Sequence, residues 1–75
     1  MKIDLHGMNI HLAWNVFVSR VTDAYYNKHK NIVVVTGQGA IAKELPQWAQ
    51  QHSRVRSCVQ TPNNPGSFKI VLKKG

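Results

Sequence analysis

An aspartate and a histidine near the start of the chain, Asp4 and His6, have a spacing that can support proton transfer. Residues two apart on a strand project from the same face, so the carboxylate can lie beside the imidazole. A carboxylate in that position holds one tautomer of the ring and raises its basicity, as in general acid–base catalysis. The same spacing also occurs on an ordinary polar strand edge. Asp4 and His6 are therefore candidate catalytic residues, and an Asp-x-His pattern alone has little specificity for catalysis.

A second segment that could do chemistry follows the apolar run of residues 32–35. Its residues are Thr36, Gly37, Gln38 and Gly39. Glycines let a backbone approach a phosphate closely, and a helix beginning after them offers unpaired N–H groups. The segment has neither the Lys-Ser/Thr ending of a Walker A loop nor the third glycine of a dinucleotide fingerprint. With Gly7 and Lys43 it forms a candidate phosphate site; a tight turn and an ordinary surface lysine are the alternatives.

The overall charge favours a polyanionic partner. The 75 residues suffice for one domain, and they carry ten Lys and Arg against three acids, a net charge of +7. No acid follows Glu44. Such an imbalance suits nucleic acid, whose counterions are released on contact. Three carboxylates argue against a two-metal nuclease centre. No metal ligand is predicted, and a divalent Mg or Mn ion stays open as a cofactor.

The remaining composition indicates an intracellular protein without a membrane partner. The single cysteine, Cys58, excludes an internal disulfide, and we expect a buried, inert thiol. There is no signal-peptide pattern and no apolar run long enough to span a bilayer, so we expect a cytoplasmic location. The chain starts directly on a strand signal, which would suit a domain excised from a longer protein. We treat residues 1–75 as one domain.

Hydrophobic periodicity predicts six elements in the order β-α-β-α-β-β. Their approximate ranges are residues 2–6, 10–30, 32–35, 40–52, 54–60 and 68–72. Asn9 is a plausible cap for the first helix, and Pro46 should kink or split the second. Trp14 and Trp48 fall on apolar helix faces and are assigned to the core. Tyr26 lies off the apolar stripe, either as amphipathic surface or as a platform for a base.

Right-handed crossovers predict an α/β fold, specifically a two-layer α+β sandwich with both helices on one face of a mixed four-stranded sheet. The last strand returns antiparallel between the second and third. This topology brings residues 4–7, 36–39 and 65–67 to one rim. Alternation places a group of basic side chains on the open face, where they could track phosphates or only resist aggregation. These residues are Arg54, Arg56, Lys69 and Lys73.

Taken together, the motifs resemble those of the Smr domain, the small MutS-related family, over essentially the whole chain. Residues 4–7 match its Asp-Leu-His-Gly signature, residues 36–39 its His/Thr-Gly-x-Gly signature, and residues 46–48 its Pro-x-Trp. The glycine-rich closing loop is matched only in part, by residues 64–67. The resemblance implies a fold similar to the C-terminal domain of translation initiation factor 3. It also implies nucleic-acid binding and, in several members, endonuclease activity tied to the Asp-x-His positions, here Asp4 and His6.

The leading prediction is therefore an endonuclease domain that cleaves or nicks RNA or DNA. His6 would act as general acid or base, and Asp4 would orient it. Residues 37–39 and the following helix start would hold the scissile phosphate. The flanking backbone would be held by Lys43, Arg54, Arg56 and Lys69. The alternative is a non-catalytic nucleic-acid-binding module of a larger protein. A third hypothesis is a protein-interaction domain whose charge is incidental.

Overall fold

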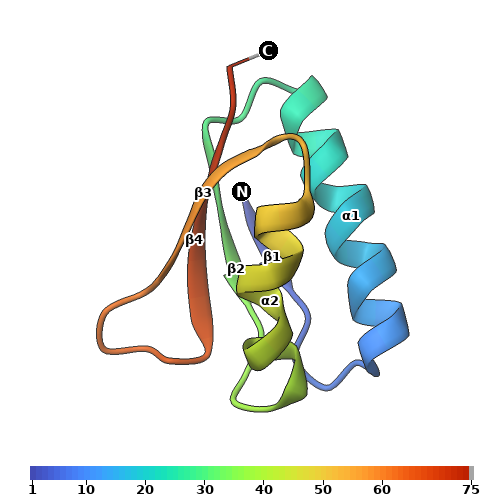
Figure 1. Ribbon diagram of the computed structural model, residues 1–75, viewed down its shortest axis with the longest axis vertical. Helices are drawn as coiled ribbons and strands as arrows, with labels where there is room; N and C mark the ends of the chain where they lie inside the picture. The colour runs from blue at the N-terminus through green and yellow to red at the C-terminus, as the bar shows by residue number, and fades with distance from the viewer. Residues whose placement is uncertain (75) are drawn as a thin grey trace.

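The computed structural model describes residues 1–74 and contains the six elements in the predicted order (Figure 1). Their bounds are β1 (Lys2–Asp4), α1 (Ile10–Tyr26), β2 (Asn31–Val35), α2 (Ala40–Gln51), β3 (Val55–Gln60) and β4 (Ser67–Leu72). No helix in these 74 residues is long and apolar enough to cross a membrane.

The four strands form one mixed sheet in the order β1-β2-β4-β3. β1 pairs parallel with β2, and β4 pairs antiparallel with both β2 and β3. Both helices cover the same face of this sheet, and the other face is open (Figure 1). The predicted two-layer sandwich, with the last strand inserted between the second and third, is confirmed.

The core lies between the two helices and the covered face of the sheet. Its largest fully buried side chains are contributed by every layer: Phe17, Leu5, Ile32, Leu45, Ile70, Val21 and Val34. Trp48 is buried, and the Trp14 ring packs edge-on against it with ring centres 5.3 Å apart. The assignment of both tryptophans to the core side of the helices is thus confirmed, with Trp14 only half-buried.

Helix α1 begins where the sequence predicts and ends earlier. The Asn9 side chain accepts a hydrogen bond of 2.8 Å from the Leu12 N–H, which confirms it as the N-cap. At the other end the N–H of His29 donates to the carbonyl of Ala24 at 2.9 Å, and Lys28 adopts a φ of 63°. This Schellman closure turns the chain out of the helix before the basic turn that was predicted to finish it.

Helix α2 runs without a break through Pro46, so the prediction that this proline splits it is wrong. A proline inside a helix removes one backbone hydrogen bond and crowds the preceding turn. Here Leu45 and Trp48 flank it and are both buried against the core, while Pro46 itself is exposed. Tertiary packing of the apolar face therefore overrides the local preference of the proline.

A bulge in edge strand β3 changes which of its side chains face the core. The register shifts between Val55 and Ser57, so that Val55 pairs with Leu72 and Cys58 pairs with Ile70. Regular alternation along residues 54–60 would place Val59 on the same side as Val55, which is buried, yet Val59 is 60% exposed. The extra residue in the bulge moves every later side chain of β3 to the opposite face.

The packing of α1 predicts a sharp difference between two substitutions in that helix. Phe17 is fully buried and contacts the Trp14 and Trp48 rings, whereas Leu12 is 49% exposed. Phe17→Ala should lower the free energy of unfolding by about 3–5 kcal/mol, because it removes a large buried ring and leaves a cavity. Leu12→Ala should change it by less than about 0.5 kcal/mol. Urea unfolding followed by circular dichroism measures both, and equal effects would contradict this description of the core.

Candidate active site

Three loops that are distant in sequence meet at the end of the sheet where β1 and β2 finish and β4 begins, the lower rim in Figure 1. The Leu5 N–H donates to the Val35 carbonyl at 2.7 Å and joins the first two loops. The Thr36 N–H donates to the Gly66 carbonyl at 2.7 Å and joins the second loop to the third. The predicted convergence of these segments at one rim is therefore present.

Thr36 fixes the geometry of this rim from a buried position. Its side chain is only 4% exposed. Its hydroxyl lies 2.8 Å from the Gly37 carbonyl and 3.2 Å from the Gly66 carbonyl, and it donates toward both. A hydroxyl whose single proton is shared between two internal carbonyls is not free to donate to a substrate. Thr36 thus supports the loop of residues 36–39, and its hydroxyl does not present a group to a ligand.

The contact between the second and third loops requires glycine. A Cβ atom placed on Gly66 would lie 3.1 Å from both the Cα and the carbonyl carbon of Gly37. Gly37 has a φ of +70°, a conformation that residues with side chains rarely adopt. The family's glycine-rich closing loop is matched here only in part, by residues 64–67. Gly66 is the glycine that makes this contact.

Asp4 and His6 form a pair on the solvent side of the rim. The carboxylate Oδ1 of Asp4 lies within hydrogen-bonding reach of Nδ1 of His6 and accepts a second bond, of 3.1 Å, from the His6 backbone N–H. The side chains are 52% and 67% exposed, respectively. The hydrogen bond from the His6 ring, reinforced by the backbone bond, holds the pKa of Asp4 below its ordinary value of 3.8. In the neutral ring, an Nδ1–H that donates to this carboxylate leaves Nε2 unprotonated and able to accept a proton.

A hollow of about 480 Å³ lies next to this pair, between the β1–α1 and β2–α2 loops. His6, Gly7 and residues 36–39 line it, together with side chains that the sequence did not assign to a site: Met8, Asn9, Ile10, Ala40 and Ile41. Gly39 is the N-cap of α2 and supplies no side chain to cap the first turn. The N–H groups of that turn are therefore available to an anion in the hollow.

The predicted basic residues do not gather at this hollow. Lys43 is exposed on α2 and does not line the hollow. Lys69 lies farther along the open face, in a row of paired positions with Val33 and Lys2. Arg56 occupies the bulge of β3 and is exposed. These cations could contact a long polyanion, but they do not surround the group beside His6.

The prediction that Arg54 lies on the open face is wrong. Its guanidinium stacks over the Tyr25 ring of α1, 4.4 Å from the ring centre, and Nη2 donates to the Tyr26 hydroxyl at 3.4 Å. Arg54 precedes the first residue of β3, so strand alternation does not govern its direction. Attraction of the cation to the two aromatic rings at the end of α1 orients it instead.

The remaining groups that could do chemistry are potential metal ligands and the single cysteine. Among residues 1–74, no three His, Cys, Asp or Glu side chains gather in a way that could hold a metal ion. Cys58 is half-buried on β3, and burial raises the pKa of its thiol, which keeps it protonated. This agrees with the expected inert cysteine.

Comparison with known proteins places these features in one family. The family model described as the Smr domain matches residues 3–72. The crystal structure of the Smr domain of Thermus thermophilus MutS2 is similar, with a TM-score of 0.90 and 17% sequence identity. The similarity covers 96% of this chain and 96% of that one, and at this identity it shows a shared fold. No curated protein matches the chain.

The close approach at Gly66 predicts a position-specific cost for a single methyl group. Gly66→Ala forces its Cβ against the Gly37 backbone and should destabilise the fold by about 1–3 kcal/mol. The matched control is Gly39→Ala, where a Cβ meets nothing within 4 Å. Thermal unfolding of the two variants measures the difference. A Gly66→Ala chain as stable as the control would mean that the loops do not meet as described.

The Asp4–His6 pair predicts a measurable titration. In His6→Ala the ring donor is lost and the backbone donor remains, so the pKa of Asp4 should rise toward 3.8 without passing it. The hydrogen bonds from His6 favour the charged form of the Asp4 carboxyl group. They therefore stabilise the folded chain above pH 3.8, and this stabilisation is lost as the pH falls through the lowered pKa of Asp4. Carbon-detected NMR of the Asp4 carboxyl follows the titration. His11→Ala is the control, and an unchanged pKa in His6→Ala would contradict the pairing.

Proposed function

This chain belongs to the Smr domain family, and on that premise we propose that it is a nucleic-acid-binding endonuclease domain that cleaves phosphodiester bonds. The observation that carries the proposal is the exposed Asp4–His6 pair beside a hollow walled by two glycine-containing loops. The pair supplies a group for proton transfer, and the hollow supplies backbone N–H groups for a phosphate. The net charge of +7 supplies attraction to the polymer.

His6 is the general base in this proposal, and Asp4 is its positioning residue. Asp4 accepts a hydrogen bond from Nδ1, which leaves Nε2 free to take a proton from a nucleophile in the solvent-exposed site. RNA carries that nucleophile in its own 2′-hydroxyl. The proton passes to Nε2, the 2′-oxygen bonds to phosphorus, and the bond from phosphorus to the 5′-oxygen breaks. The 5′-oxygen takes a proton from solvent, giving a 2′,3′-cyclic phosphate and a 5′-hydroxyl.

The glycine loop and the start of α2 hold the phosphate as its charge builds up. Gly37, Gln38 and Gly39 line the hollow with the first residue of α2. The Gly37 N–H already donates to the Gly66 carbonyl at 3.2 Å, so the proposed donors to a bound anion are the N–H groups at the start of α2, together with the helix dipole. Such preorganised donors act mainly on the charge that develops in the transition state. Lys43, Arg56 and Lys69 lie farther away and are proposed to contact the flanking backbone.

A divalent ion fits this site poorly on the chemistry of its donors. Mg²⁺ and Mn²⁺ prefer oxygen ligands and usually bind through one or two carboxylates together with substrate phosphates. In the described chain no carboxylate lines the hollow, and Asp4 directs Oδ1 to His6. We therefore derive no step through a metal and favour RNA as substrate over a metal-assisted nick in DNA.

Cleavage assays with matched histidine variants test the proposal. End-labelled single-stranded RNA and supercoiled plasmid are incubated with the chain, with and without chelator. His6→Ala should lower the rate of RNA cleavage by about 10²- to 10⁴-fold, the usual contribution of a general base. His11→Ala, an exposed histidine on α1 outside the pair, should cut at the wild-type rate. Products ending in a 2′,3′-cyclic phosphate identify the attack of the 2′-hydroxyl.

The outcomes separate three functions. If His6→Ala cuts as well as wild type, the mechanism is wrong. If the wild type cuts neither substrate but binds RNA with an affinity that falls steeply with salt, the chain is a non-catalytic binding module. If it shows no affinity for nucleic acid near physiological salt, a protein-interaction domain replaces both. Cleavage of plasmid that stops on adding chelator would restore the metal-assisted alternative.

A further inference from the structure

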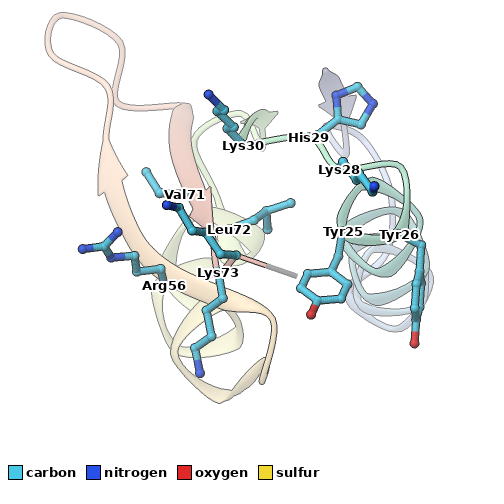
Figure 2. Close-up of a pocket in the computed structure, with 10 residues that line it drawn as sticks. Tyr25, Tyr26, Lys28, His29, Lys30, Arg56, Val71, Leu72 and Lys73 are labelled. Carbon is cyan, nitrogen blue, oxygen red and sulfur yellow. The ribbon is translucent and has the colours of Figure 1, made fainter.

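A second hollow lies at the rim opposite the Asp4–His6 pair. It measures about 740 Å³ and is bounded by the end of α1, the turn into β2, the bulge of β3 and the end of β4. In Figure 2, Tyr25 projects from α1 into this space, and Leu72 points toward it from the sheet. We call this hollow the distal pocket. It is larger than the hollow of about 480 Å³ beside His6.

Positive charge is concentrated at the distal pocket. Five of the ten Lys and Arg side chains of the protein line it: Lys28, Lys30, Arg56, Lys73 and Lys74. No aspartate or glutamate is among its lining residues. Within residues 1–74, the one ion pair is that of Asp4 and His6, so these cations have no carboxylate within salt-bridge distance. The ligand that fits such a group of cations carries several negative charges.

The wall of the distal pocket toward α1 is aromatic and held in place. Arg54 stacks on Tyr25 and donates to the Tyr26 hydroxyl, and the two tyrosine rings meet edge to face with centres 5.4 Å apart. Tyr26 is nevertheless 66% exposed. A flat aromatic surface that is exposed and yet fixed costs little conformational entropy when it binds a planar ligand.

We propose that the distal pocket binds a nucleotide of single-stranded nucleic acid outside the cleavage site, with its base against Tyr26 and its phosphates among the lysines. The ligand assignment rests on the proposed function of the domain. Several cations beside an aromatic surface are the combination that single-strand binding uses: phosphates are neutralised while bases stack. A duplex keeps its base faces stacked within itself and offers no such surface to tyrosine.

The distance between the two rims sets the length of the bound strand. β4 spans the sheet from one rim to the other with six residues, which corresponds to roughly 17 Å at about 3.3 Å per residue. At about 3.4 Å per nucleotide of a stacked strand, this is about five nucleotides. Lys69 and Lys2 lie on the open face between the rims, where the strand would pass.

Binding measured apart from cleavage tests the proposal. Fluorescence anisotropy with a labelled single-stranded octanucleotide is carried out in a His6→Ala background, for RNA and for DNA. Tyr26→Ala should weaken binding about tenfold, and Tyr26→Phe, which keeps the ring, should not. Lys28→Gln combined with Lys30→Gln should make the slope of log K against log salt less negative by about 1.4, or about 0.7 per phosphate contact. Arg20→Gln, a cation of α1 outside the pocket, should change the slope by much less than 0.7.

Three results would overturn the distal pocket. The first is an octanucleotide that binds the Tyr26 and lysine variants as tightly as it binds the parent, the protein that carries His6→Ala alone. This result would refute the pocket and leave the proposed function intact. The second is an equal loss for a duplex of the same sequence, which would make the contact one of charge alone. The third is an octaglutamate peptide that competes as well as the oligonucleotide, which would assign the pocket to an acidic protein. Loss of all nucleic-acid binding in the parent would instead refute the proposed function.

Discussion

The junction between Thr36 and Gly66 is the constraint on which the rest of the site depends. It exists because β4 is inserted next to β2, with Val35 opposite Ser67. The backbone bond from Thr36 to Gly66, and the absence of a Cβ at Gly66, let the β3–β4 hairpin loop pack directly on the loop of residues 36–39. A Cβ placed on Gly37 would in turn lie 3.4 Å from the Cβ of His6, so this loop also passes close to the histidine. One backbone contact thus links the closing strand to the histidine proposed to act in catalysis.

The two ends of the sheet have different chemistry. One rim exposes a single paired carboxylate and imidazole beside backbone N–H groups, with few lysines or arginines. The opposite rim gathers half of the basic side chains around two tyrosines. In the proposed function, this separation would let a polymer be held at one rim and cut at the other. It also keeps a dense cluster of cations away from His6, so that the ring is not crowded by like charge when it takes a proton.

In a domain of 75 residues, the same helices supply both the core and the walls of the two hollows. The residues that complete the core, among them Leu45 and Trp48, come from the same helix whose first turn closes the hollow. The helix continues through Pro46 because the side chains of its apolar face are buried in the core: Ile41, Leu45, Trp48 and Ala49. Likewise, the early end of α1 at its Schellman closure is what turns Lys28 and Lys30 toward the distal pocket. The contacts that form the core and end α1 therefore also set the positions of the side chains at the two hollows.

Local patterns in the sequence were sufficient to predict the element order, the Asn9 cap, the strand order and the meeting of the Asp4–His6 segment with the glycine segment. These follow from periodicity, capping chemistry and the handedness of crossovers, which act over a few residues or apply to all chains. Tertiary structure alone decided the face of each β3 side chain, the stacking of Arg54 on Tyr25, and the gathering of cations at the distal rim. One extra residue in a strand reverses its alternation, and a long cationic side chain turns toward whatever partner the fold brings near it. Neither is encoded in the spacing of neighbouring residues.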